Sequence, residues 1–357
     1  MLTRSLSQWF QLSLARLRVR SARRRRNVLR PELLETRVVP AVFVVNTTAD
    51  TVDAFIGDGL AQDADGNTSL RAAIQESNAL VGADSIQLPA GVYQITRPNV
   101  SSEDFAVDGD FDVTSNITIT GNSASDTIID ANQLDRVFEV FTAGDLFLKN
   151  VTLRNGLADV GGAIRSFQGS LDIRDSVLTN NRANIRGGAI EISGVTGDVL
   201  GIYTTTLSNN LANGNANPGT PSGNGIGGAI SASGSMQVNL SQAVLSNNMA
   251  AGEGGAFDSR SLTSLSIVQS QFSNNFAASG GAIRLFSTPT TITGTSFNGD
   301  HAVSTGGAIR SNFSNITMSR ATFDNVYLTN PNGVGSAGGV MYVTSTSTTA
   351  NTTQIQY

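Results

Sequence analysis

The sequence predicts an all-β protein, a right-handed parallel β-helix or solenoid with a short N-terminal capping helix. Two observations carry this prediction. The tetrapeptide Gly-Gly-Ala-Ile recurs along the chain, and between its copies apolar residues alternate with polar ones. Self-similarity at a nearly fixed period is typical of repeat architectures, in which each repeat stacks on the one before it.

The tetrapeptide starts at residues 161, 187, 227, 280 and 306, and variants of it start at Gly254 and Gly338. Most neighbouring copies lie 26 or 27 residues apart. The longer gap before residue 227 holds an Asn-, Gly- and Pro-containing stretch over 213–224, which we expect to form a loop. Each copy therefore marks the same point of one coil.

Short strands fill the space between the copies. Leu171 and Ile173 are two residues apart, Leu178 follows, and Asn180 comes two residues later. An apolar period of two indicates strands, because side chains alternate faces there. A leucine-rich repeat has a similar length, but its Leu-x-x-Leu-x-Leu run is missing. We expect one internal aliphatic stack to contain Leu171, Leu200, Val238 and Leu265.

Asn and Gly are expected to shape the corners of the coil. Asn tolerates a left-handed backbone, and stacked amides can form a hydrogen-bonded ladder. The Gly pairs allow the positive φ of a sharp corner. These roles are structural. The column expected at the Asn corner consists of Asn180, Asn209, Asn247 and Asn274.

Two resemblances to known families follow from these motifs. Gly-Gly-Ala-Ile, together with Phe272-Ser273-Asn274-Asn275, resembles the repeats of polymorphic outer-membrane proteins over residues 140–345. This resemblance implies a β-helical passenger region and a role in adhesion. The segment from Thr68 to Ile74 resembles the Cys-Ser-Leu-Arg-Glu-Ala element that precedes β-helices in secreted bacterial proteins, with Thr68 in place of Cys and Ala72 in place of Glu.

Four regions are predicted along the chain. Residues 1–40 form an Arg-rich targeting or sorting segment, 41–95 a cap region, 96–345 the β-helix repeats and 346–357 a Ser/Thr-rich tail. Within the cap region, Thr68 or Ser69 can cap a helix whose apolar side covers the open edge of the first coil. Residues 33–41 also resemble a segment found near the start of large secreted proteins in some bacteria.

Charge and composition narrow the choice of partners. The first 40 residues hold 10 Arg and 2 acidic residues, which leaves 13 of the 23 basic and 26 of the 28 acidic side chains for the rest. An acidic body disfavours nucleic acid, because binding to phosphates needs Lys and Arg. No apolar run approaches the roughly 20 residues that span a bilayer. The chain has no Cys, so disulfides and thiolate metal sites are excluded.

An enzyme that cleaves polysaccharides is the main alternative to a binding module. Its chemistry needs carboxylates at matching positions of adjacent coils. Asp172 instead aligns with Phe147, Gly201 and Gln237, and the only His, His301, has no partner identifiable by spacing. The candidate binding strip follows Gly-Gly-Ala-Ile, where Glu191 can meet Arg165 and Asp258 can meet Arg284 as exposed ion pairs. The strip contains Arg165, Glu191, Asp258, Arg284 and Arg310.

Calcium is the only cofactor that the sequence suggests. Asp63, Asp65 and Asn67 form part of an Asp-x-Asp-Gly-Asn loop, although a twelve-residue calcium loop with a closing Glu is incomplete. A second acidic loop lies at 103–112. A solvated loop is the alternative interpretation of both.

The expected function is that of an exported cell-surface protein, associated with the outer membrane, that acts as an adhesive or structural module and not as an enzyme. Its faces, rich in Ser, Thr, Asn and Gly, suit weak multivalent contacts with glycans, cell-surface components or copies of itself. The alternative is a β-helical polysaccharide lyase or glycoside hydrolase. Neither nucleic acid nor an integral membrane span is expected.

Overall fold

A computed structural model describes residues 40–100, 105–142, 144–214, 224–331, 333, 335–344 and 353–356. The chain divides into two units, Met1–Arg37 and Val38–Tyr357. The predicted targeting segment, apart from residue 40, and most of the Ser/Thr-rich tail lie outside the described residues. The second unit holds every helix and strand of the described residues.

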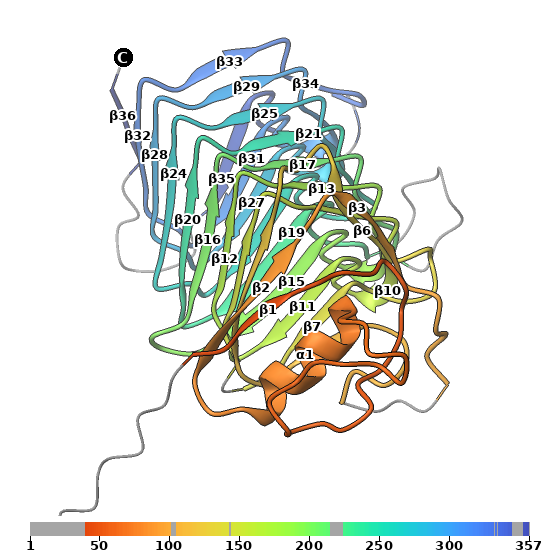
Figure 1. The fold of residues 1–357 in the computed structure, drawn as a ribbon. Helices are drawn as coiled ribbons and strands as arrows, with labels where there is room; N and C mark the ends of the chain where they lie inside the picture. Colours follow the sequence, from red (N-terminus) through yellow and green to blue (C-terminus); the bar gives the residue numbers. More distant parts are fainter. Residues whose placement is uncertain are drawn as a thin grey trace, which may run out of the picture. The chain divides into compact units, whose positions relative to one another are not determined.

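The second unit is a parallel β-solenoid, as the sequence predicts (Figure 1). From residue 146 on, each coil contributes a strand to sheet A, then to sheet B, then to sheet D and then to sheet C, whereas the described residues of the earlier coils have no strand in sheet D. Every pairing between coils is parallel. The coil over residues 171–194 shows this route with β12 (Leu171–Arg174), β13 (Val177–Thr179), β14 (Arg182–Arg186) and β15 (Ile190–Gly194). Each strand inside a sheet therefore pairs with its counterparts in the previous and following coils, and each edge strand pairs with one of them.

Within each sheet the strands follow one another in the order of the coils. Sheet A contains β1 (Val42–Val44), β2 (Ala83–Leu88), β5 (Asn116–Gly121), β8 (Leu146–Lys149), β12 (Leu171–Arg174), β16 (Val199–Tyr203), β20 (Gln237–Ser241), β24 (Ser264–Val268), β28 (Thr290–Thr293), β32 (Ile316–Ser319) and β36 (Thr353–Gln356). Sheet B contains β3 (Gly91–Gln94), β6 (Thr127–Asp130), β9 (Thr152–Arg154), β13 (Val177–Thr179), β17 (Thr206–Ser208), β21 (Val244–Ser246), β25 (Gln271–Ser273), β29 (Ser296–Asn298) and β33 (Thr322–Asp324). Sheet C contains β4 (Phe111–Val113), β7 (Phe138–Val140), β11 (Ile164–Phe167), β15 (Ile190–Gly194), β19 (Ile230–Gly234), β23 (Phe257–Arg260), β27 (Ile283–Phe286), β31 (Ile309–Asn312) and β35 (Met341–Thr344). Sheet D contains β10 (Leu157–Val160), β14 (Arg182–Arg186), β18 (Leu211–Ala212), β22 (Met249–Ala250), β26 (Phe276–Ser279), β30 (His301–Thr305) and β34 (Tyr327–Leu328).

The core consists of columns of apolar side chains that run through successive coils. The predicted aliphatic stack is confirmed, because Leu171 pairs with Leu200, Leu200 with Val238 and Val238 with Leu265, and all four are buried. On sheet B the rings of Phe272 and Phe297 stack with centroids 5.0 Å apart. Burial of these apolar columns along the stack is the main favourable contribution to the free energy of folding.

The two Gly residues of each repeat serve different purposes. Gly187 has φ +65°, and the first Gly of every other copy is also left-handed, as predicted. The second Gly is not left-handed. A Cβ on Gly188 would overlap the carbonyl oxygen of Gly228 in the next coil, so close backbone stacking requires Gly there.

The Asn ladder lies one residue later than predicted. Asn180 and its equivalents do adopt a left-handed backbone, with φ +57° at Asn180. The buried amides that bond from coil to coil belong to the following residue: Asn181 Nδ2 donates to Asn210 Oδ1 at 3.0 Å. The ladder runs through Asn181, Asn210, Asn248 and Asn275 and ends at Asp300.

The helix α1 (Leu70–Ala79) covers the N-terminal end of the solenoid, where it contacts β2, β4 and β5 (Figure 1). Ser69 caps it by accepting a hydrogen bond from the Ala72 N–H at 3.0 Å, so Ser69 and not Thr68 is the cap. Ile74 is fully buried, whereas Val81 is 77% exposed. Among the described residues, no helix has both the length and the apolar character needed to cross a membrane.

Candidate functional site

The charged residues predicted as a binding strip lie on neighbouring strands of sheet C. Arg165 pairs with Glu191, and Asp258 pairs in register with Arg284, which pairs with Arg310. Ser231 separates the two groups, since it pairs with Glu191 on one side and with Asp258 on the other. The column therefore forms two charged clusters, an N-terminal cluster around Arg165 and Glu191 and a C-terminal cluster around Asp258, Arg284 and Arg310.

The C-terminal cluster is joined by an acid that the sequence analysis did not single out. Arg284 lies 2.9 Å from Asp258 and 3.2 Å from Glu253, and Arg310 lies 2.6 Å from the other oxygen of Glu253. Arg260 adds a second contact to Asp258 at 3.1 Å. Every charge in this cluster has an opposite charge beside it.

The N-terminal cluster also contains partners that were missed. Glu139 Oε1 lies 2.7 Å from Arg165 Nη1, and the Glu139 carboxylate also forms an ion pair with Arg136. Arg136 in turn contacts Asp110 at 3.0 Å, and Arg186 contacts Glu191 at 3.2 Å. The direct contact of Arg165 with Glu191 is longer, at 4.0 Å.

The repeat itself carries a signal for these partners. Glu139 follows Phe138, which pairs with Ile164 of the first Gly-Gly-Ala-Ile, so one more coil upstream would have revealed it. Glu253 directly precedes the Gly pair at 254. Extending the columns beyond the tetrapeptide would have placed both acids next to the Arg column.

The carboxylates of the two expected ion pairs are buried, whereas some of their Arg partners, such as Arg165, stay partly exposed, so the expectation of fully exposed pairs is corrected. Asp258 is 0% exposed and Glu191 is 4% exposed, because Arg side chains of the same and neighbouring strands lie across them. Burial, partly offset by nearby Arg residues, raises the pKa of Asp258 and of Glu191. Breaking a buried pair costs much more than breaking one at the surface.

We expect Asp258→Ala to lower the free energy of unfolding by about 3 kcal/mol, because it leaves Arg284 and Arg260 without this buried carboxylate. Asp175→Asn is the control, since Asp175 is exposed, lies 3.9 Å from Lys149 and has a left-handed backbone that Asn tolerates. The control should cost at most about 1 kcal/mol. Denaturant unfolding measures both, and equal small losses would show that the cluster adds no more than a surface pair.

Asp110 is an acid of the N-terminal cluster whose pKa is strongly raised. Burial raises its pKa to about 7, although Arg136 beside it acts in the opposite direction. A carboxyl group with such a pKa is protonated over part of the neutral range and can act as a general acid. A raised carboxyl pKa, which Asp110 shares in direction with Glu191 and Asp258, is a property that catalytic acids also have.

The predicted calcium loop is held together by Asp63. Its Oδ1 accepts hydrogen bonds from the backbone N–H groups of Asp65 and Asn67 at 3.0 and 2.8 Å, and its Oδ2 accepts from the Thr51 hydroxyl. Asp63 and Asp58 also line a hollow of about 430 Å³. In the described residues no three His, Asp or Glu side chains gather as a metal-binding group, and calcium stays a prediction.

The second acidic loop lies partly outside the described residues, at Glu103 and Asp104. Of its other acids, Asp110 pairs with Arg136, and Asp112 accepts a hydrogen bond from the Ala106 N–H at 2.6 Å. These carboxylates therefore hold the segment 106–112 in place.

The single His is part of an aromatic column on sheet D. The His301 ring lies 4.8 Å from that of Phe276 and 5.0 Å from that of Tyr327, and its Nδ1 is 3.0 Å from the Gly299 carbonyl oxygen. Its ring faces are covered by its neighbours. No Ser nucleophile bonds to it in the described part of the chain.

Two adjoining hollows lie on the outward face of sheet A and were not foreseen from the sequence. One has a volume of about 410 Å³, the other about 310 Å³, and Thr118 lines both. The smaller one is lined by amide, hydroxyl, carboxylate and aromatic groups, among them Asn116, Asp145, Phe147 and Asp172. Asp172 pairs here with Phe147 and Gly201 as expected, but the next residue in its column is Asn239 and not Gln237.

Comparison of the chain with protein-family models, curated proteins and solved structures finds no match. The parallel β-solenoid therefore rests on the geometry of this chain alone. The resemblances to two families remain predictions.

Proposed function

We propose that this protein is an exported cell-surface β-solenoid that binds glycans and acts as an adhesive or structural module. The observation that supports this best is the pair of adjoining hollows on sheet A, whose combined lining offers hydroxyl, amide, carboxylate and aromatic groups. Glycans carry hydroxyl edges and apolar ring faces, and both are recognised by such mixed linings. The hydroxyl-rich strands repeat along the stack, which suits multivalent binding.

Other features fit the same proposal. The charged column is engaged in ion pairs, so its residues are better suited to tying coils together than to handling a substrate. The repeats that resemble polymorphic outer-membrane proteins favour an outer-membrane-associated, adhesive role. Contacts with cell-surface components or with copies of the same chain belong to this proposal too.

A binding and turnover screen tests the proposal. The full chain is presented with neutral and acidic polysaccharides, with and without calcium, and both binding and the release of reducing or unsaturated ends are measured. We expect binding without release. Absence of binding to every glycan would contradict the proposal, and calcium-dependent binding would agree with the calcium site predicted at Asp63, Asp65 and Asn67.

A polysaccharide lyase or glycoside hydrolase is the second candidate, and the raised pKa of Asp110 favours it. In this case Asp110 would donate a proton to the leaving group. Release of sugar ends in the screen, abolished by Asp110→Asn while the fold is retained, would establish the enzyme and overturn the binding module.

A further inference from the structure

One wall of the smaller hollow is a row of polar side chains fixed by the coil above them. The Asp145 N–H donates to Asn116 Oδ1 at 3.1 Å, the Ser170 N–H donates to Asp145 Oδ1 at 2.8 Å, and the Val199 N–H donates to Ser170 Oγ at 3.2 Å. Neither Asn116 Nδ2 nor Asp145 Oδ2 makes a hydrogen bond within the described residues. These atoms are held in place and remain available to a ligand.

The opposite wall comes from the outward positions two residues further along the same strands. Thr118 pairs with Phe147, and Phe147 pairs with Asp172, so a hydroxyl, a ring and a carboxylate lie on three successive coils. The Phe147 ring is half-buried. The hollow between the walls is therefore polar at both rims and aromatic in the middle.

A charged and aromatic cluster continues this wall. Asp172 holds the Arg174 guanidinium with two contacts of 2.7 and 2.8 Å. The guanidinium lies 5.4 Å from the centre of the Phe147 ring and 4.7 Å from that of Tyr203. The Tyr203 ring covers Gly201, where a Cβ would overlap it. Stacking on both rings and pairing with Asp172 give Arg174 a defined position.

We propose that this hollow, lined by Asn116, Asp145, Phe147 and Asp172, binds a neutral oligosaccharide, an inference that rests on the glycan-binding function proposed above. A sugar ring can place its apolar face on Phe147 and its hydroxyl groups on the amide and carboxylates. The two carboxylates, one of them already paired with Arg174, make the hollow acidic and repel a polyuronate. The adjoining hollow, which reaches Gln87 and Asn122 and shares Thr118, extends the site to further sugar units.

The test compares binding of the full chain to neutral hexose oligosaccharides and to polygalacturonate by titration calorimetry. Phe147→Ala should weaken binding of the neutral ligand about tenfold by removing the stacking surface. Thr118→Met, which fills the space shared by the two hollows, should weaken it as well. Phe167→Ala is the matched control, because Phe167 is 47% exposed on sheet C, and it should bind as the wild type does.

Each outcome bears on the proposal. Loss of neutral binding in both sheet A variants, with Phe167→Ala unaffected, supports it. Unchanged affinity in Thr118→Met overturns the site even if Phe147→Ala fails to fold, and leaves the general glycan-binding function in place. Preference for polygalacturonate overturns the ligand class. Failure of the wild type to bind any glycan rejects the proposed function and this site together.

Discussion

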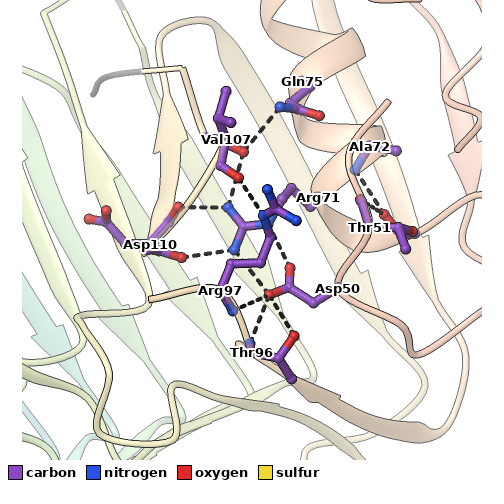
Figure 2. Close-up of polar contacts among 12 residues, drawn as sticks. Asp50, Thr51, Arg71, Ala72, Gln75, Thr96, Arg97, Val107 and Asp110 are labelled. Carbon is purple, nitrogen blue, oxygen red and sulfur yellow. Dashed lines mark hydrogen bonds and ion pairs between the residues drawn. The ribbon is translucent and has the colours of Figure 1, made fainter. Parts of the chain in front are cut away.

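Replacement of Arg71 by Met is expected to lower the free energy of unfolding by about 3–5 kcal/mol, the cost of breaking a buried ion pair by removing one partner. Arg71 is 0% exposed, and its Nε lies 2.6 Å from Asp50. Its other nitrogens donate to the carbonyl oxygens of Ala106, Gly109 and Asp110 at 3.0, 2.8 and 3.2 Å. One guanidinium thus ties α1 to Asp50 within the cap region and to the segment 106–110 that follows it (Figure 2).

Arg71→Met removes the cation beside the Asp50 carboxylate and the donor to three backbone carbonyl oxygens. Asp50 would keep only its hydrogen bonds from Thr96 and from the Arg97 N–H, shown beside it in Figure 2. Arg97→Met is the matched control, since the Arg97 side chain donates to the Val107 carbonyl oxygen from a partly exposed position. The control should cost about 1 kcal/mol.

Denaturant unfolding of Arg71→Met, Arg97→Met, Asp50→Asn and the double variant Asp50→Asn/Arg71→Met measures this effect. The double variant should lose less than the sum of the two single changes, because the buried charge disappears together with its partner. Additive losses would show that Asp50 and Arg71 act independently. Arg71 is the Arg of the segment that resembles the Cys-Ser-Leu-Arg-Glu-Ala element, and its contacts give it a structural role here.

The second large effect is expected at the end of the Asn ladder. Asp300 Oδ1 accepts hydrogen bonds from the N–H and the Nδ2 of Asn275 at 2.9 and 2.8 Å. Asp300 is 0% exposed, and its Oδ2 has no hydrogen-bond partner within the described residues. Burial raises the pKa of Asp300 to about 7, against the lowering effect of the Asn275 hydrogen bonds.

The hydrogen bonds of Asn275, the residue before Asp300 in the ladder, explain why Asp300 Oδ2 lacks a partner. Asn275 Nδ2 also donates to the Leu245 carbonyl oxygen at 2.9 Å, and Leu245 pairs with Phe272 in the next coil. Asp300 follows Asn275 in the ladder as Phe272 follows Leu245 in sheet B, so this register directs Asp300 Oδ2 toward the Phe272 carbonyl oxygen. A carbonyl oxygen can only accept a hydrogen bond. An ionised carboxylate is unfavourable at this position, whereas an amide or a protonated acid can donate.

Asp300→Asn is therefore expected to stabilise the protein above neutral pH, by about 4 kcal/mol at most. The folded pKa lies above the unfolded value of about 3.8, so the native state holds an extra proton between about pH 4 and pH 7. Stability of the wild type consequently falls as pH rises through this window. In the variant, stability should depend less on pH, because the contribution of Asp300 is gone and the contribution of Asp110 remains.

Melting temperatures at several pH values between about 4 and 8 measure the effect. Asp324→Asn is the control, because Asp324 is exposed in the coil that follows, and it should follow the wild type. An Asp300→Asn variant with the unchanged pH slope, or one less stable than the wild type at pH 8, would contradict this assignment.

The repeat by itself determined the solenoid, because residues one period apart must stack when every coil pairs in parallel with the next. It also gave the composition of the core columns, such as Leu171 above Leu200, and the covering role of the helix that begins after Ser69. Alternation with a period of two is enough for the core columns, since it states which side chains face inward. The helix follows from its capping residue and its apolar side.

Only the tertiary structure decided what happens at the corners and between distant residues. In the pair Asn180-Asn181, the left-handed backbone of Asn180 turns the side chain of Asn181 inward. The sequence shows two neighbouring Asn residues and does not show which of them is buried. Arg310 meets Glu253 across 57 residues because the corner brings together strands of different coils. The hollows of sheet A likewise depend on the side chains of several coils, so their shape arises only when the coils are stacked.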